Sequence, residues 1–217
     1  MRYYPVFWRS DLLSMNWNLI LAVAEAYLLG AVPFGYLFVR YTMGQDVRKL
    51  GSGNIGATNV HRTAGRKAGI VVLLLDIAKG FAAVFIAAKL TGGSSMGLAL
   101  SALAVMAGHA FPVFLGFRGG KAVASFIGAF LYIAPLALAA VLGIFVIVVA
   151  LSKYISLASI LSALLFPLAV WLILHPDRPI LVASIVAGLF IVYRHKANIS
   201  RLMQGKENVF SFKGGGR

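Results

Sequence analysis

The sequence predicts an all-α membrane protein with seven transmembrane helices, and three observations point to this fold class. Of the 217 residues, 60% are hydrophobic and only 12% are charged, whereas soluble domains carry about 45–50% apolar and about 25% charged residues. The mean hydropathy of +0.89 excludes a disordered chain, because disorder requires low hydrophobicity. The apolar residues also form long runs, several of which reach the roughly 20 residues that a helix needs to cross a bilayer.

These runs define the expected helices. Those that cross the membrane as one helix each are expected at 17–39, 68–90, 96–117, 155–174 and 180–193. The remaining run, 122–151, is long enough for two helices and contains Pro135 near its middle, where a helix tends to break. We predict two short helices around Pro135, which brings the total to seven.

Positive charge predicts the orientation of the helices. If the run at 122–151 forms two helices, most Lys and Arg fall on one side of the membrane, whereas a single helix would divide them almost evenly. Cytoplasmic loops are enriched in Lys and Arg. We therefore expect the amino terminus outside, the carboxyl terminus in the cytoplasm and the polar loops on the cytoplasmic face.

The expected domain organisation is an extension at 1–16, a single transmembrane domain at 17–203 and a cytoplasmic tail at 204–217, with Met15 as an alternative start to Met1. The net charge of +14 suits basic cytoplasmic loops, anionic lipids or phosphorylated substrates, and nothing beyond this charge favours nucleic-acid binding. With no Cys and 4 His that lack clustered carboxylates, thiolate chemistry is excluded and we expect neither a metal nor a cofactor.

The first unusual polar stretch is Ser-Gly-Asn-Ile-Gly-Ala-Thr-Asn at 52–59. Glycines let backbone N–H groups form a concave nest, and Ser, Asn and Thr add neutral donors. An arginine that follows can bind a phosphate through two parallel hydrogen bonds. We interpret the stretch as a phosphate-binding loop rather than a Gly-rich hinge, with these candidate residues: Ser52, Gly53, Asn54, Gly56, Thr58, Asn59 and Arg62.

A second stretch runs from Gly-His-Ala-Phe-Pro at 108–112 to a Gly-Gly-Lys sequence. Gly119 and Gly120 allow close backbone approach to a ligand, and the cation of Lys121 beside them suits a phosphate. The alternative is that Lys121 extends to the lipid headgroups.

Two further pairs lie near helix ends. Ser156 and Ser159 are three residues apart, so their hydroxyls share a helix face close to an amino end, where anions are favoured; helix capping and packing explain them equally well. His195 and Asn198 have the same spacing. This histidine can act as an acid–base group or donate to a phosphate, with the asparagine orienting it.

Ionisable residues also fall well inside two of the predicted helices. Asp76 and Lys79 are spaced i, i+3 and are interpreted as an intramembrane ion pair, and Glu25 is expected to hydrogen-bond across helices. The functional alternative is a proton or ion path, which would make the protein a transporter or flippase for a phosphorylated solute.

Taken together, the polar stretches resemble the bacterial acyl-phosphate:glycerol-3-phosphate acyltransferases, the PlsY family. The resemblance covers about Leu19 to Glu207. It rests on the stretches at 52–59, 108–112 with 119–121, Lys153 with its two serines, Arg-His-Lys-Ala-Asn-Ile-Ser-Arg-Leu at 194–202, and Gly-Lys-Glu at 205–207. Thioester-dependent acyltransferases carry a His, four residues and then Asp, and this motif is absent from the sequence.

The resemblance implies a multi-pass enzyme of the bacterial inner membrane that works as a monomer, without a cofactor, at its cytoplasmic face. It implies transfer of a fatty acyl group from acyl-phosphate to the sn-1 hydroxyl of glycerol 3-phosphate, giving lysophosphatidic acid and phosphate, the first step of phospholipid biosynthesis. The proton acceptor stays open between His195 and the departing phosphate. The family usually has Gly where Ala122 stands, which changes the backbone beside the lysine. The site residues implied are Ser52, Asn54, Arg62, Lys121, Ser159, His195 and Asn198.

Overall fold

The computed structural model describes residues 17–210. The expected extension at 1–16, with its choice between Met1 and Met15, lies outside the described residues. So does the part of the expected tail at 211–217.

The described chain is helical throughout, and residues 17–210 contain no strand. Two single 3₁₀ turns, Val47–Lys49 and Val113–Leu115, lie in its loops. The α-helices are α1 (Trp17–Ala31), α2 (Phe34–Met43), α3 (Ala57–Ala64), α4 (Arg66–Leu90), α5 (Ser95–Ala110), α6 (Val123–Ile133), α7 (Pro135–Ser152), α8 (Ile155–Leu174), α9 (Arg178–Arg194) and α10 (Lys196–Met203).

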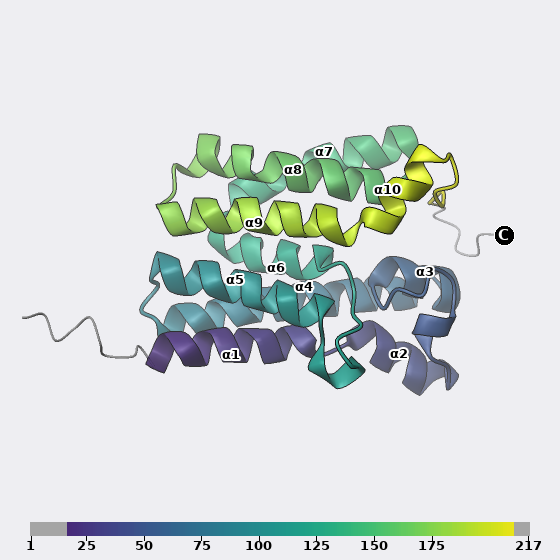
Figure 1. Ribbon diagram of the computed structural model, residues 1–217, viewed down its shortest axis with the longest axis horizontal. Coiled ribbons are helices and arrows are strands. Elements are labelled where there is room, and N and C mark those ends of the chain that lie inside the picture. Colours follow the sequence, from purple (N-terminus) through teal and green to yellow (C-terminus); the bar gives the residue numbers. More distant parts are fainter. Residues whose placement is uncertain (1–16, 211–217) are drawn as a thin grey trace, which may run out of the picture.

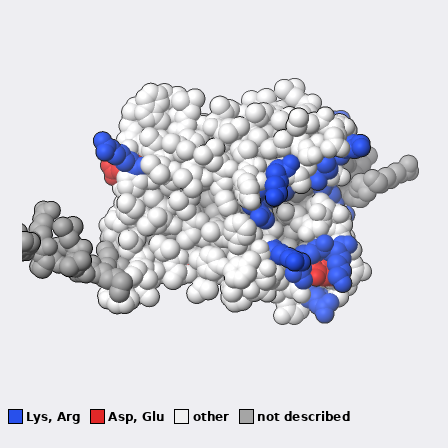
Figure 2. Space-filling model, viewed as in Figure 1, with Lys and Arg blue, Asp and Glu red and all other residues white. Residues whose placement is uncertain are grey.

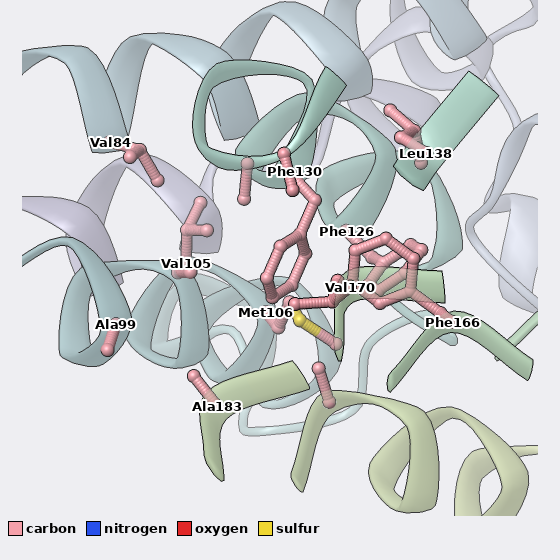
Figure 3. Packing of buried hydrophobic residues seen from close by; sticks show 14 of the residues in the cluster. Val84, Ala99, Val105, Met106, Phe126, Phe130, Leu138, Phe166, Val170 and Ala183 are labelled. Atoms are coloured by element: carbon pink, nitrogen blue, oxygen red, sulfur yellow. The ribbon is translucent and has the colours of Figure 1, made fainter. Parts of the chain in front are cut away.

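The long helices lie side by side in two groups, which meet at α6 and where α5 packs against α9. On one side α1 and α4 pack against α5, and on the other α8 packs between α7 and α9 (Figure 1). The largest buried side chains gather where α6 meets the second group: the rings of Phe126 and Phe130 lie 4.8 and 4.7 Å from the ring of Phe166 in α8 (Figure 3). Aromatic pairs at this separation stabilise a core beyond their buried area.

Small residues let α6 approach α4 closely. A side chain on Gly80 would overlap the backbone carbonyl of Ser125, and a side chain on Gly128 would overlap that of Ile77. Such contacts replace the hydrophobic driving force that helices lack inside a lipid bilayer.

The predicted multi-pass helical fold is confirmed in its coarse features. Among the described residues, five helical segments are long and apolar enough to cross a membrane: Trp17–Met43, Arg66–Leu90, Ser95–Leu115, Pro135–Ser152 and Ile155–Leu174. The pair α9 and α10, bent by 57°, makes a sixth, and α6 is a shorter apolar helix. The count of seven spans and the orientation of the termini stay predictions.

Three helix boundaries differ from expectation. The helix predicted at 96–117 ends as α5 at Ala110, two residues before Pro112, and a separate 3₁₀ turn follows. The chain does break at Pro135, which begins α7 at a position where no backbone N–H is needed. Of the two helices around this break, only α6, with 11 residues, is short, since α7 has 18 residues. The run at 17–39 is not one helix, since Pro33 ends α1 and separates it from α2.

The charged residues gather at one end of the bundle. Figure 2 shows Lys and Arg concentrated near the end where α2, α3 and α10 lie, with a single blue and red group at the opposite end on this face. The loops that the sequence analysis singled out are therefore brought to a common end of the molecule.

Candidate functional site

The loop before α3 is organised by Asn59, whose side chain is buried. Its Oδ1 accepts a hydrogen bond of 2.8 Å from the backbone N–H of Ser52, and its Nδ2 donates to the carbonyls of Leu50 (3.0 Å) and Asn54 (2.8 Å). The Oδ1 of Asn54 in turn accepts from the N–H of Gly56 at 2.8 Å. Asn59 thus holds the loop in shape from inside, while the exposed Ser52 and Gly53 face outward.

The Gly-Gly-Lys turn is held by the end of α5. Gly119 donates its N–H to the carbonyl of Ala110 (3.1 Å), and Gly120 donates to that of His109 (3.0 Å). A side chain on Gly120 would overlap the ring of His109. Both glycine N–H groups, expected from the sequence to face a phosphate, therefore have partners within the protein.

Ala122 follows this turn in a backbone conformation that usually requires glycine. Its φ is 62°, and its methyl group is fully buried at the start of α6. Left-handed backbone costs an L-residue roughly 1–2 kcal/mol, which explains physically why glycine suits this position.

The two serines of α8 differ in their bonding. The hydroxyl of Ser159 donates to the carbonyl of Ile155 at 2.9 Å within the helix. The hydroxyl of Ser156 is buried and has no hydrogen-bond partner among the described residues. Because a buried polar group without a partner costs free energy, Ser156 is the serine with bonding capacity left for a ligand.

His195 lies at the bend between α9 and α10 and is buried. Its Nδ1 lies 2.8 Å from the carbonyl oxygen of Ile191. A carbonyl can only accept, so Nδ1 carries the hydrogen and the neutral ring leaves Nε2 as an acceptor. This tautomer suits a group that takes a proton from a substrate hydroxyl.

Asn198 and Glu207 form a buried pair that links α10 to the segment after it. The Nδ2 of Asn198 donates to one carboxylate oxygen of Glu207 at 2.9 Å, and the Nε of Arg201 donates to the other at 2.9 Å. In the sequence, Glu207 stands out only as the end of the Gly-Lys-Glu match to the family. One feature of the sequence could have identified Glu207 as a site residue: it is the single carboxylate in the basic segment that begins at Arg194.

Glu207 lies within electrostatic range of two cations from separate parts of the chain, Arg62 of α3 and Lys121 of the glycine turn. Both Arg62 and Lys121 interact electrostatically with it, and Lys121 also interacts with His195. Burial is the main effect that lowers the pKa of the Lys121 ammonium, to about 8, and the guanidinium groups of Arg201 and Arg62 add to it. Burial likewise lowers the pKa of Arg62, while Glu207 opposes that shift.

The segment after α10 connects both groups of helices at this end. The N–H of Phe210 donates to the carbonyl of Lys153 at 2.8 Å, just before α8, and the Phe210 ring lies 5.4 Å from the ring of His61 in α3. Residues 204–210 therefore tie the start of α8 to the helix that carries Arg62.

A hollow of about 590 Å³ opens beside the glycine turn. Its single carboxylate, Asp46, receives hydrogen bonds from Arg48, which hold the Asp46 pKa down at about 2. The net charge of the lining is therefore positive, which favours anions. The lining residues are Asp46, Arg48, Lys49, Gly53, Phe117, Arg118, Gly119 and Arg194.

Some of the predicted site residues lie near one another in the structure, and others do not. Asn198 bonds directly to Glu207, and Arg62, Lys121 and His195 lie within electrostatic range of this carboxylate. The contacts described for Ser52, Asn54 and Gly56 stay within their own loop. Within residues 17–210, no group of three His, Cys, Asp or Glu is placed to hold a metal ion.

The intramembrane ion pair predicted from the sequence is confirmed. The Nζ of Lys79 lies 2.9 Å from a carboxylate oxygen of Asp76 and also donates to the carbonyl of Val32 at 2.8 Å, where the chain breaks between α1 and α2. The Oε2 of Glu25 has no hydrogen-bond partner among the described residues. The expected cross-helix bond is thus not made by that oxygen.

The fold and this site define a class of protein: a multi-pass helical membrane protein with a buried, cationic, hydroxyl-bearing site at one end. The sequence model of the family described as glycerol-3-phosphate acyltransferase matches residues 20–205. The chain belongs to this family.

Its relatives support the assignment along nearly the whole chain. Proteins named glycerol-3-phosphate acyltransferase are 43% identical in Desulforamulus reducens, over 87% of this chain and 93% of that protein, and 44% identical in Geobacter sulfurreducens, over 89% and 98%. The crystal structure of PlsY, an integral membrane glycerol 3-phosphate acyltransferase, in its glycerol 3-phosphate form has a TM-score of 0.84, with 39% identity over 89% of this chain and 96% of that one. Its lysophosphatidic acid form gives 0.81, with 37% identity over 89% and 95%.

Proposed function

We propose that this protein transfers a fatty acyl group from acyl-phosphate to the sn-1 hydroxyl of glycerol 3-phosphate, giving lysophosphatidic acid and phosphate, the first step of phospholipid biosynthesis. The observation that carries the proposal is that His195 and the hydrogen-bonded pair of Asn198 and Glu207 lie at one end of the bundle, within electrostatic range of the cations of Arg62 and Lys121. It is supported by membership of a family whose solved relative has glycerol 3-phosphate and lysophosphatidic acid forms.

Both proposed substrates are anions that carry a phosphate, and the cationic groups match them. Arg62 offers a planar fork for two phosphate oxygens and Lys121 a point charge. The free hydroxyl of Ser156 adds a neutral donor. We assign phosphate binding to these residues together with Ser52, Asn54 and Ser159.

The reaction needs no covalent enzyme intermediate, because acyl-phosphate is already activated. The sn-1 oxygen attacks the acyl carbonyl carbon, the new ester C–O bond forms, and the bond from that carbon to the phosphate oxygen breaks. Phosphate leaves with the electron pair, and the hydroxyl proton passes to Nε2 of His195 or to the departing phosphate. The charge of Lys121 stabilises the negative charge that develops on the carbonyl and phosphate oxygens.

Holding both substrates in one site supplies a second part of the rate. Orientation of two reactants contributes several kcal/mol to lowering a barrier. The acyl chain lies among the membrane helices, and we place the enzyme, as a monomer, in the bacterial inner membrane with its amino terminus outside and its site loops at the cytoplasmic face.

The decisive test is phosphate release by purified protein in lipid, with palmitoyl-phosphate and glycerol 3-phosphate, for the wild type and Lys121→Ala. We expect release that requires both substrates and collapses in the variant. The matched control is Lys89→Ala, which removes an exposed lysine in the last turn of α4. This variant should keep wild-type activity. No release by folded wild-type protein would overturn the proposal and favour transport of a phosphorylated solute.

A further inference from the structure

The turn that carries Lys121 lies outside the helices, between α5 and α6. The N–H groups of Gly119 and Gly120 are bound by carbonyls at the end of α5. Their carbonyl groups are bound from the opposite side by one residue of α9, Arg194. The turn is therefore fixed between two helices through all four backbone polar groups of the glycine pair.

Arg194 binds this turn with a geometry that suits only a guanidinium. Its Nε and Nη2 donate to the carbonyl of Gly120 at 3.1 and 2.8 Å, and Nη2 also donates to the carbonyl of Gly119 at 3.2 Å. The ring of Phe111 lies 5.0 Å from the guanidinium carbon. A lysine has the charge but cannot reproduce the rigid fork of donors or stack its plane on a ring.

The bonds join the two residues that directly precede the reacting groups. Gly120 is followed by Lys121, and Arg194 is followed by His195. The Arg194–Gly120 contact therefore sets how far the ammonium of the second loop lies from the imidazole at the bend after α9. In the sequence alone, Arg194 is indistinguishable from the other basic residues of a cytoplasmic flank.

We propose that Arg194 is a positioning residue that fixes Lys121 relative to His195. This inference rests on the proposed acyltransferase function. Arg194 acts through the backbone of the glycine turn, and its hydrogen bonds described above go to protein carbonyls. The competing role is direct binding of a substrate phosphate, since Arg194 also lines the cationic hollow.

Comparing the activities of Arg194→Lys and Arg194→Gln separates the two roles, since the lysine keeps the positive charge of Arg194 but not its fork of donors, and the glutamine keeps neither. For a positioning residue we expect both variants to lose kcat by a similar factor, about 10- to 100-fold, because misplacing a reacting group by about 1 Å costs up to about 100-fold. The KM for glycerol 3-phosphate should change much less. The matched control is Arg40→Lys, an exposed arginine of α2 that also donates to a backbone carbonyl, that of Gly44 at 2.8 Å, and lies outside the hollow, and it should retain wild-type kcat.

A second measurement reads the position of Lys121 without using activity. The rate at which the Lys121 amine is acetylated across a pH series, followed by mass spectrometry, reports its titration. Besides burial, the charge of Arg194 itself lowers the pKa of Lys121, so the titration is compared in Arg194→Lys, which keeps that charge. A Lys121 released from its buried position should titrate nearer to the ordinary lysine value of about 10.4 in this variant, and the Arg40→Lys control should titrate like the wild type. Thermal unfolding in detergent reports the folded fraction, to which kcat is normalised.

The outcomes are distinct. Wild-type kcat in Arg194→Lys, or a raised KM with unchanged kcat, would overturn the positioning role and assign Arg194 to phosphate binding. An unmoved Lys121 titration in the folded Arg194→Lys variant would also overturn it. A wild type that releases no phosphate overturns the proposed function instead, and the acetylation series then still decides whether Arg194 holds Lys121.

Discussion

The side-chain amide of Asn198 donates a hydrogen bond of 2.9 Å to Glu207, and this bond decides which end of Asn198 faces a ligand. Because Nδ2 is used, Oδ1 remains, and it is buried without a hydrogen-bond partner among the described residues. An amide oxygen can only accept. It therefore fits a hydroxyl donor such as the glycerol moiety of the proposed substrate.

Removing Glu207 should weaken the fold and the site together. Glu207→Ala leaves the buried amide of Asn198 and the guanidinium of Arg201 without their acceptor. We expect the free energy of unfolding to fall by about 1–3 kcal/mol, the usual cost of an unsatisfied buried polar group. Denaturant titration in detergent measures this loss, with the exposed Gln204→Ala in the same segment as the control. Equal stability of the two variants would contradict a structural role for the carboxylate.

His195 should contribute to the chemical step. Its Nδ1 is occupied by Ile191, which leaves Nε2 to take the substrate proton. If Nε2 is the acceptor, His195→Ala lowers kcat by about 100- to 10,000-fold, as general-base groups do. Phosphate release under saturating substrates measures kcat. A fully active His195→Ala enzyme would leave the departing phosphate as the proton acceptor.

The titration of Lys121 should appear in both activity and stability. Burial lowers the pKa of this lysine to about 8, so the ammonium that stabilises the transition state is lost as pH rises through about 8. Activity in the unliganded enzyme, measured as kcat/KM, should fall on that basic limb. Lys121→Arg, which stays charged at all these pH values, should remove this limb even where its activity is low.

The free energy of unfolding should rise with pH, whereas activity falls. Between pH 8 and the unfolded value of about 10.4, the unfolded chain binds more protons at this position than the folded protein, so the free energy of unfolding rises with pH. Lys121→Met should abolish this rise with pH. It should also raise the free energy of unfolding below pH 8, because no buried ammonium remains. Denaturant titrations at a series of pH values would contradict this reading if the wild type and Lys121→Met ran parallel.

Sequence patterns were sufficient to predict those features of the fold that depend on residues close together in the chain. Apolar runs located the long helices, Pro135 located the break between α6 and α7, and the spacing of Asp76 and Lys79 identified their ion pair. Each of these depends on residues within one or two turns of each other, or on the length of one run.

The site was less predictable because its contacts join distant segments. Arg194 and Gly120 are 74 residues apart, and no periodicity marks such a contact. The composition of the glycine turn predicts close backbone approach to a phosphate, whereas its N–H groups are directed to α5 by tertiary packing. Glu207 lies beyond the last long helix and is drawn into the site only because the chain turns back after α10.

Replacing Ala122 with glycine should be nearly neutral although its methyl group is fully buried. Relief of the left-handed conformation returns about 1–2 kcal/mol, which offsets about 0.8 kcal/mol for the lost methyl and about 0.4–1 kcal/mol for the freer unfolded chain. The control is Ala129→Gly, equally buried but inside α6, which should cost about 2 kcal/mol because nothing is relieved. Equal losses in thermal unfolding would show that Ala122 is not strained.

The ion pair inside the bundle should be structural rather than part of an ion path. Asp76→Leu alone leaves the Lys79 ammonium buried with the carbonyl of Val32 as its remaining hydrogen-bond acceptor, and breaking a buried pair in this way costs about 3–5 kcal/mol. The double variant Asp76→Leu with Lys79→Met removes both charges, so it should recover much of that stability and retain acyl transfer measured in lipid. Because a transporter that works through these charges would lose its function in the double variant, stable protein without phosphate release would revive the transport alternative.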